Sequence, residues 1–262
     1  MSEAFIYDAV RTPRGRNRGG ALHGTKPIDL VVGLIDAVRE RNPDLDDAQI
    51  DDIVLGVVSP VGEQGSDIAR TAALVAGLDE SVAGVQINRF CASGLQALAM
   101  AAHMVRVEGA QAILAGGVES ISLVQPPVRH SREAWIEEHR PDLYLPMIDT
   151  ADIVAARYGV SREAQDEYAL RSQQRIAAAQ QAGKFADEIV PIDVTRAVID
   201  KATNETTPED FTLTGDECNR PSTTLEGLAA LKPVKGEDKF ITAGNASQLS
   251  DGAAALMVMD GD

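Results

Sequence analysis

The chain has 262 residues, of which 44% are hydrophobic and 24% charged, and its 40 acidic and 24 basic side chains give a formal net charge of −16. This length and apolar content are sufficient for one large or two modest domains with a buried core. The negative charge argues against a nucleic-acid or anionic-membrane surface, because both require an excess of Lys and Arg. An anionic ligand would have to meet a local basic patch.

The two cysteines, Cys91 and Cys218, lie far apart, lack metal-ligand spacing and are too few for a disulfide scaffold, which favours a reducing compartment. The N-terminus has neither the basic region nor the apolar run of a signal peptide. No window approaches the roughly 20 apolar residues of a membrane span. We therefore expect a cytoplasmic protein with no membrane segment and no metal site.

Short β-rich runs alternate with helical patterns through the first 120 residues. Pro27 suits the first turn of a helix, and Leu30, Leu34 and Val38 share one face of it. The predicted elements are a strand at 5–10, a helix at 27–41, a strand at 50–58, a helix at 67–78, a strand at 85–87, a helix at 92–107 and a buried strand at 112–115 that ends at two glycines. Repeated βαβ units imply a mostly parallel sheet covered by helices.

From about residue 121 to 240 the sequence is punctuated by proline, charged and rich in helical patterns, which is typical of an insertion built on the α/β core. Its clearest element is a helix at 162–182, with Ser161 as N-cap and Gly183 just past the end. Core-like sequence returns after residue 240. The predicted division is an N-terminal core at 1–120, an inserted domain at 121–240 and a return to the core at 241–262.

Cys91 stands where the predicted strand at 85–87 gives way to a helix made mostly of small residues. The unpaired N–H groups and positive end of a helix favour a thiolate and can hydrogen-bond an oxyanion on an attached acyl group. A thiolate there can accept an acyl group. The alternative is that Cys91 is a small buried hydrophobic residue, the commoner role of a lone cysteine. For Cys218, in a polar stretch, we favour a structural role.

A thiol nucleophile normally needs a base, but none of the four histidines is a convincing partner. His103 is 12 residues along the helix from Cys91, which is about 18 Å at a rise of 1.5 Å per residue. His23 follows an Arg- and Gly-rich loop, and His130 and His139 lie in the charged insertion. The base is therefore missing from the recognisable part of the sequence.

Two further groups of charged residues are assigned no catalytic role. Arg11, Arg14, Arg16 and Arg18 form a dense basic cluster, which we interpret as a solvated loop. Glu119 follows the strand predicted at 112–115, and we expect it to organise backbone N–H groups and not to act as a catalytic acid.

Four ordered blocks carry a family resemblance that covers essentially the whole chain. Residues 88–94 (Asn-Arg-Phe-Cys-Ala-Ser-Gly) resemble the nucleophile signature of thiolases, and residues 116–122 resemble their Gly-Gly-x-Glu-Ser-Met-Ser strand end. Residues 220–233 and 242–254 are similar to two further thiolase blocks. The fold class implied is α/β: a thiolase-like βαβ core with a mostly parallel mixed sheet covered by helices, plus an inserted helical loop domain over the coenzyme A site. The C-terminal core half of thiolases would be absent.

The resemblance also implies a coenzyme A site. It places Arg220 near the adenine and phosphate end, a role that suits a planar cation. Ser247, with the small residues Ala243 and Gly244, would lie along the pantetheine arm, and Met147 would line its inner end. From the residues alone, Arg220 could equally be a solvated surface cation and Ser247 a turn hydroxyl.

The activity implied is that of a thiolase, an acyl-coenzyme A acyltransferase of fatty acid metabolism. Cys91 would attack the 3-keto carbonyl of a 3-ketoacyl-coenzyme A and hold the shortened acyl group as a thioester until a second coenzyme A removes it. The reverse reaction is a condensation. Coenzyme A is a substrate, and no permanently bound cofactor is expected. Residues 146–148 (Pro-Met-Ile) stand where some biosynthetic thiolases have His-Met-Gly, which favours the degradative 3-ketoacyl thiolases.

In thiolases the histidine that activates the nucleophile and a second, acid–base cysteine belong to the C-terminal half. The expected partners are therefore a C-terminal thiolase half, acyl-coenzyme A thioesters and further copies in a homodimer or homotetramer. Two alternatives remain open. One is a non-catalytic thiolase-like half that binds acyl-coenzyme A or lipid, and the other is a ketosynthase-like enzyme that uses an acyl carrier protein.

Overall fold

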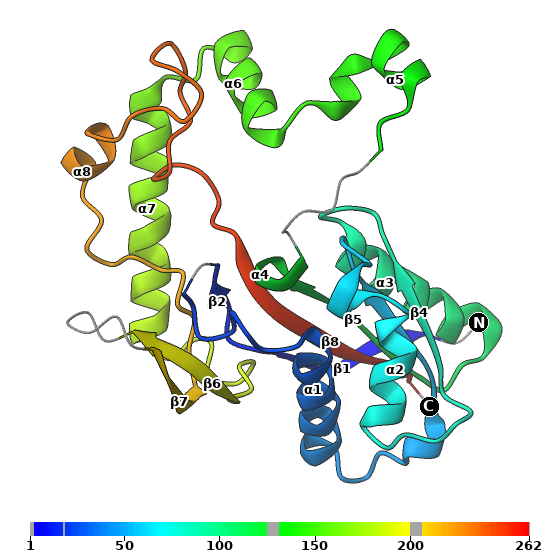
Figure 1. Cartoon of the computed structure of the whole chain (residues 1–262). Helices are drawn as coiled ribbons and strands as arrows, with labels where there is room; N and C mark the ends of the chain where they lie inside the picture. Colours follow the sequence, from blue (N-terminus) through cyan, green and yellow to red (C-terminus); the bar gives the residue numbers. More distant parts are fainter. Residues whose placement is uncertain (1–2, 18, 125–130, 200–205, 262) are drawn as a thin grey trace. The chain divides into compact units, whose positions relative to one another are not determined.

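The computed structural model describes residues 3–17, 19–124, 131–199 and 206–261. The chain divides into two compact units, which we treat separately (Figure 1). The core unit comprises Met1–Pro127, Ala186–Cys218 and Leu249–Asp262. The loop unit comprises Val128–Phe185 and Asn219–Gln248.

The core unit is built on one mixed sheet with the strand order β1-β8-β5-β3-β4. Its strands are β1 (Ala4–Arg11), β3 (Ile50–Gly56), β4 (Ala83–Ile87), β5 (Ala112–Ser120) and β8 (Ser250–Asp260), and the short β2 (Gly15–Arg16) pairs with β8. β3 is parallel to β4 and β5, whereas β8 is antiparallel to both β1 and β5. The long strands other than β8 therefore all point the same way, and the expected α/β fold is confirmed as a mixed sheet with one reversed strand.

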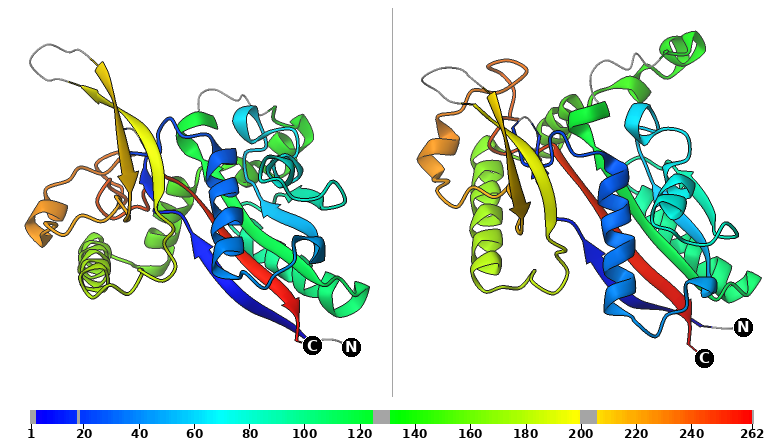
Figure 2. Two further views of the ribbon diagram at one scale, coloured as in Figure 1. Left: turned by 90° about the horizontal axis from the view of Figure 1, so that it is seen from below. Right: turned by 60° about the horizontal axis from the view of Figure 1, so that its bottom comes forward.

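Helices cover both faces of this sheet. They are α1 (Pro27–Arg41), α2 (Ile68–Val75), α3 (Ser93–His103), which continues as a π-helical turn (Met104–Glu108), and the short α4 (Ile121–Val124). α1 lies over β1 and β8 (Figure 2). Ile53 and Leu55 pack into the cluster that contains α1 and α2, whereas Val54 packs with Ala97 and Ala101 of α3. Successive residues of a strand point to opposite faces, so β3 is buried on both sides.

The predicted helix at 27–41 coincides with α1, and Leu30, Leu34 and Val38 are all buried. The strand predicted at 112–115 is longer than expected. β5 continues through Gly116 and pairs with β8 as far as Ser120. A Cβ at Gly116 would lie 2.0 Å from the carbonyl oxygen of Ala254, so this glycine permits the close approach of β8 instead of ending the strand.

The hairpin of β6 (Ile192–Ile199) and β7 (Thr206–Leu213) belongs to the core unit, not to a continuous insertion at 121–240. Ile192, Val194 and Leu213 are buried in the same hydrophobic cluster as α1. The loop unit instead takes in residues 219–248, including the core-like residues at 241–243, which form no strand. The buried residues that alternate along β6 pack on the core and place the hairpin in the core unit. The charged residues around them make this alternation difficult to recognise in the sequence.

The loop unit is mainly helical. It contains α5 (Ala134–His139), α6 (Met147–Tyr158), α7 (Arg162–Gln181) and α8 (Leu225–Ala229). α7 begins as predicted, because the Ser161 hydroxyl accepts a hydrogen bond from the N–H of Ala164 at 3.2 Å. It ends before Gly183, whose φ of 66° lies in the left-handed region.

In the described part of the chain, one segment, Phe90–Glu108, which contains α3 and its π-helical turn, is long and apolar enough to cross a membrane by length and composition alone. The expectation that no window approaches such a span was therefore wrong. Ala97, Ala101 and Val105 of this helix pack on the sheet, which accounts for its apolar inner face. Only 22% of the window is buried, and Leu95 on its outer face is 71% exposed.

Candidate active site

Cys91 lies in the turn that joins the end of β4 to the start of α3, as the sequence predicts. Its side chain is exposed. The preceding residue, Phe90, has a φ of +48°, in the left-handed region that residues with a side chain rarely adopt. Such strained residues persist only where their surroundings hold them. The turn around Cys91 must therefore be supported from outside.

Two polar side chains supply that support. Asn88 Oδ1 accepts a hydrogen bond from the N–H of Phe90 at 2.9 Å, and Asn88 Nδ2 donates to the carbonyl of Val58 at 2.9 Å. The Ser93 hydroxyl accepts from the N–H of Arg89 at 2.8 Å and donates to the carbonyl of Phe90 at 2.6 Å. Together these bonds fix the backbone immediately before the nucleophile candidate, from Arg89 to Phe90.

Glu119 extends this support to the neighbouring strands. Its Oε2 accepts a hydrogen bond from the N–H of Val58 at 2.8 Å, and its Oε1 accepts from Nε2 of Gln64 at 3.0 Å. Gln64 is completely buried and also accepts from the N–H of Ser120. Glu119 thus holds the backbone N–H of Val58 directly, in line with the predicted role, and that of Ser120 through Gln64. Val58 is the link, since its N–H bonds to Glu119 and its carbonyl to Asn88.

The end of β3 packs directly behind this turn. A Cβ added at Gly56 would lie 2.6 Å from the carbonyl carbon of Ser93 and 2.7 Å from the nitrogen of Gly94. Real Cβ atoms do not approach backbone so closely, so the contact requires glycine. The sheet therefore sets where α3 begins, and with it the position of Cys91.

The structure describes His23, His103 and His139, and places all three at the surface. His139 stacks on Trp135 and its Nδ1 lies 2.9 Å from the carbonyl of that residue. His130 lies outside the described residues. Within the described ranges, no hydrogen bond joins Cys91 to a histidine. In those ranges there is also no group of three or more His, Cys, Asp or Glu side chains that could hold a metal ion.

Cys218 has the opposite surroundings to Cys91. It is buried at 3% exposure, and its Sγ lies 3.3 Å from the hydroxyl of Ser250 and 3.9 Å from the carbonyls of Arg14 and Gly15. These contacts fit the structural role favoured from the sequence.

Arg11 corrects one expectation, because it does not belong to a solvated loop. It ends β1 and forms ion pairs at 2.7 Å with both Glu188 and Asp216. Burial alone would raise the pKa of Asp216. Hydrogen bonds from Arg11 and from the N–H of Arg14, with the charge of Arg11, outweigh that effect and hold this pKa below its ordinary value. Arg14 and Arg16 are exposed as predicted, and Arg18 lies outside the described residues.

Three of the residues assigned to coenzyme A line one pocket of about 320 Å³ in the loop unit. They are Arg220, Ala243 and Gly244. Arg220 is exposed, and its N–H donates to Oε1 of Gln173 on α7 at 2.8 Å. Ser247 is exposed between two residues that line the same pocket.

Gly244 allows the two walls of this pocket to touch. A Cβ at this position would lie 2.5 Å from Cδ2 of Leu228 and 2.6 Å from Cδ1 of Leu231. Both leucines line the pocket from the side of α8. The close packing of Leu228 and Leu231 therefore explains why a small residue stands at position 244.

Met147 is placed apart from the other coenzyme A candidates. It is the first residue of α6, is 78% exposed, and lines a second, apolar pocket of about 300 Å³ together with Val154, Val160 and Ile241. The residues assigned to coenzyme A thus divide between two pockets of the loop unit.

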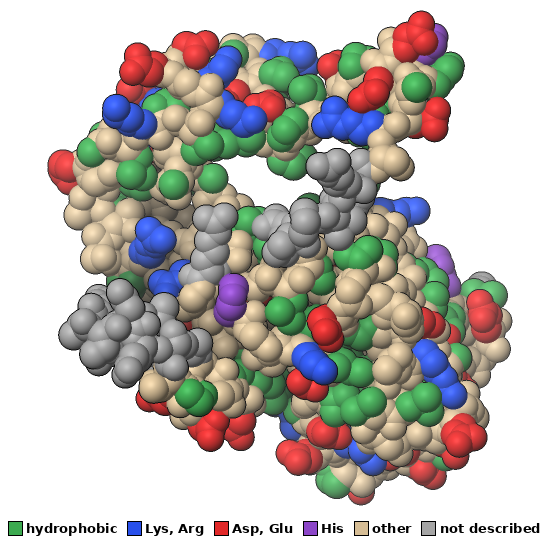
Figure 3. Space-filling view, viewed as in Figure 1, with side chains coloured by type: hydrophobic (Ala, Val, Ile, Leu, Met, Phe, Trp, Pro, Cys, Tyr) green, Lys and Arg blue, Asp and Glu red, His purple; other side chains and the backbone are tan. Residues whose placement is uncertain are grey.

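Acidic side chains are spread over both units on the face shown in Figure 3, with Lys and Arg side chains interspersed among them. This distribution agrees with the net charge of −16.

The sequence was compared with protein families and with known proteins. Residues 4–262 match the family of the thiolase N-terminal domain. The chain is 40% identical over 262 residues to 3-ketoacyl-CoA thiolase of Bacillus subtilis (strain 168). This alignment covers 99% of this chain and 66% of that protein. The chain is 42% identical over 276 residues to β-ketoadipyl-CoA thiolase of Pseudomonas aeruginosa, with 98% and 65% covered.

Solved structures give the same result. Human mitochondrial 3-ketoacyl-CoA thiolase in complex with CoA superimposes with a TM-score of 0.82 at 32% identity, over 100% of this chain and 65% of that one. The mixed α/β core is thus that of a thiolase domain. The chain belongs to the thiolase family, as its N-terminal domain, and the resemblance seen in the sequence is confirmed. The chain spans 65–66% of the length of these relatives.

Proposed function

We propose that this chain supplies the nucleophile and the coenzyme A pocket of a thiolase that cleaves 3-ketoacyl-coenzyme A. The observation that carries the proposal is the exposed Cys91 on a turn fixed by Asn88 and Ser93, in a chain that matches the thiolase N-terminal domain over residues 4–262. A supported, accessible thiol is what acyl transfer requires.

The reaction has two acyl-transfer steps. The Cys91 thiolate attacks the 3-keto carbonyl, the bond between the 2- and 3-carbons breaks, and the released carbanion takes a proton to give acetyl-coenzyme A. The thiolate of a second coenzyme A then attacks the Cys91 thioester, forms the shortened acyl-coenzyme A and releases the cysteine. The groups that move the protons lie, by resemblance, in a C-terminal thiolase half. Run backwards, the same steps condense two acyl-coenzyme A molecules.

The loop unit would bind the coenzyme A substrate. Arg220 suits the adenine and phosphate end, because a guanidinium stacks on rings and forms bidentate hydrogen bonds to phosphate. Ala243 and Gly244, with Ser247 beside them, suit the narrow pantetheine arm, and Met147 its inner end. Two observations support this assignment: Arg220 and the two small residues share one pocket, and a structural relative is a complex with CoA.

The finer assignments rest on relatives and on sequence. The names of two relatives, 3-ketoacyl-CoA thiolase and β-ketoadipyl-CoA thiolase, agree with the degradative type of thiolase that residues 146–148 favour. A role in fatty acid metabolism, a cytoplasmic location and assembly into a homodimer or homotetramer with a C-terminal half complete the proposal. The alternatives of a non-catalytic binding half and a ketosynthase-like enzyme receive no support from these relatives.

Thiolysis measured with this chain and a matching C-terminal thiolase half tests the proposal. We expect loss of the 3-ketoacyl thioester on addition of coenzyme A, abolished by Cys91→Ser because serine is a much weaker nucleophile than a thiolate. Cys218→Ser is the matched control and should retain turnover. Equal turnover by Cys91→Ser and the wild type would refute the assignment of the nucleophile.

A further inference from the structure

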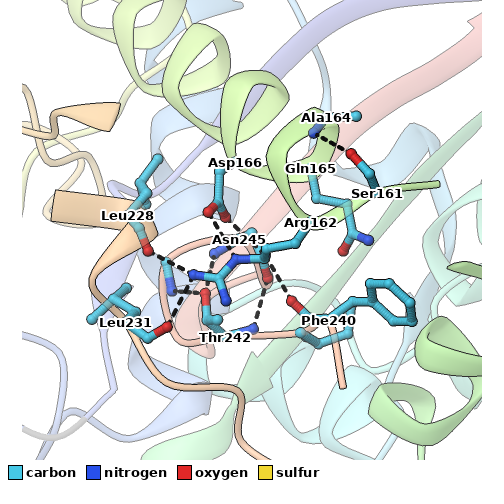
Figure 4. A network of polar contacts seen from close by, with 12 residues as sticks. Ser161, Arg162, Ala164, Gln165, Asp166, Leu228, Leu231, Phe240, Thr242 and Asn245 are labelled. Atoms are coloured by element: carbon cyan, nitrogen blue, oxygen red, sulfur yellow. Dashed lines mark hydrogen bonds and ion pairs between the residues drawn. The ribbon is translucent and has the colours of Figure 1, made fainter. Parts of the chain in front are cut away.

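A network of polar contacts in the loop unit joins the start of α7 to Leu228, Leu231 and the turn at 242–245 (Figure 4). Leu228, Leu231 and Gly244 line the same pocket as Arg220. The centre of the network is Arg162, the first residue of α7, whose Nε donates to Oδ2 of Asp166 at 2.7 Å. The side chains of Arg162 and Asp166 are 18% and 3% exposed. This ion pair is largely shielded from water. Charge-assisted hydrogen bonds are stronger in such a low-dielectric environment than in water.

Arg162 holds the first wall of the pocket. Its Nη2 donates to the carbonyls of Leu228 at 2.7 Å and Leu231 at 3.0 Å, which lie at and just after the end of α8. The side chains of both leucines line the pocket. A planar guanidinium can serve Asp166 and these carbonyls together because its five donors are fixed in one fork.

Asp166 holds the second wall through Asn245. Its Oδ1 accepts from Nδ2 of Asn245 at 3.0 Å, and Asn245 Oδ1 accepts from the N–H of Thr242 at 2.8 Å. The Thr242 hydroxyl in turn accepts from the N–H of Gly244 at 3.2 Å. These bonds close a turn that presents Ala243 and Gly244 to the pocket.

The two walls meet at Gly244, where a Cβ would displace the side-chain ends of Leu228 and Leu231. A small shift of either wall would therefore change the shape of the pocket. We propose that Arg162, Asp166 and Asn245 are positioning residues, which hold the end of α8 and the turn at 242–245 at the separation that admits coenzyme A. This inference rests on the proposed function, because it takes coenzyme A as the occupant of the pocket.

Asn245→Ala is the sharpest test, because it disconnects the turn and leaves the Arg162–Asp166 ion pair in place. With the C-terminal half present, we expect KM for coenzyme A in thiolysis to rise roughly tenfold, which corresponds to about 1.4 kcal/mol. We expect kcat to stay within about twofold, because the network does not touch the reacting atoms. The rate of Cys91 alkylation by iodoacetamide should not change.

Two further variants separate positioning from general stability. Asn245→Asp keeps the acceptor for the N–H of Thr242 but sets a carboxylate against Asp166 and against the carbonyl of Phe240, to which Asn245 Nδ2 donates at 3.1 Å, and should also raise KM for coenzyme A. Asp8→Asn breaks the Arg41–Asp8 ion pair of the core unit, at 2.8 Å, and should leave KM for coenzyme A unchanged. If Asn245→Ala does not fold, Arg162→Lys replaces it, since lysine keeps the charge but lacks the fork that serves both walls.

Unchanged KM in Asn245→Ala, or an equal rise in Asp8→Asn, would overturn the positioning role while leaving the proposed function intact. A wild-type protein that turns over no 3-ketoacyl thioester and binds no coenzyme A by calorimetry would overturn the proposed function, and this inference with it.

Discussion

Cys91 and Cys218 show how much a residue's role depends on its surroundings. The position of Cys91, between a strand and a helix of small residues, could be predicted from the sequence because both neighbours have clear local patterns. Of its supporting residues, only Glu119 was predicted to bind backbone N–H groups, and the partners of the supporting residues were not predicted. Asn88 bonds to Val58, 30 residues earlier in the chain, and Gln64 bonds to Glu119, 55 residues later. Local patterns carry no information on partners that only the sheet brings together.

The same contrast predicts the reactivity of the two thiols. Because Cys91 is exposed and Cys218 is 3% exposed with polar neighbours, iodoacetamide near neutral pH should label Cys91 first. Peptide mapping by mass spectrometry after short exposures measures both sites in one sample. Faster labelling of Cys218 in folded protein would show that its burial does not protect it.

At the scale of elements, local signals set boundaries well where they agree with packing. Pro27 and the spacing of Leu30, Leu34 and Val38 predicted α1 from end to end. These signals failed where contacts between distant segments determine the extent or the packing of an element. Gly116 reads as the end of a strand, but β8 approaches it and β5 continues, and the buried alternation of β6 is masked by charged neighbours. The residues of the pocket proposed for coenzyme A were predicted only through resemblance, and the network around Arg162 was not predicted at all.

The ion pairs of Arg11 should make folding stability depend on pH. They join the end of β1 to Glu188 and Asp216, beside the stretches where the chain passes between units. The pKa of Asp216 is lower in the folded state than in the unfolded state. In an unfolded chain the pKa of an Asp side chain is about 3.9. The contribution of Asp216 is therefore present above pH of about 4 and is lost as pH falls through the folded-state pKa.

Urea unfolding of the wild type and Asp216→Asn between pH 7 and about pH 3 measures this contribution. The variant should be less stable at pH 7, and the gap should narrow as Asp216 of the wild type is protonated. Asp238→Asn, whose carboxylate is 81% exposed, is the control and should show little difference at either pH. A gap for Asp216→Asn that stays constant over this range would contradict the role given to its ionised form.

For the whole molecule, composition and family resemblance predicted the α/β class, and the thiolase relationship holds over residues 4–262. The division into units was less accessible, because residues 186–218 return to the core unit through packing and not through a change in composition. The exposed outer face of α3, with Leu95 at 71%, likewise follows from the assembled structure. In the sequence it resembles any apolar core helix.

The most direct test of the account is to trap the acyl group on the chain. With a matching C-terminal thiolase half and acetyl-coenzyme A, in the absence of an acyl acceptor, the peptide that contains Cys91 should gain the mass of one acetyl group. Added coenzyme A should remove that mass, since the thioester is an intermediate. Acetylation that persists in Cys91→Ser, or that is found on Cys218 instead, would contradict the account.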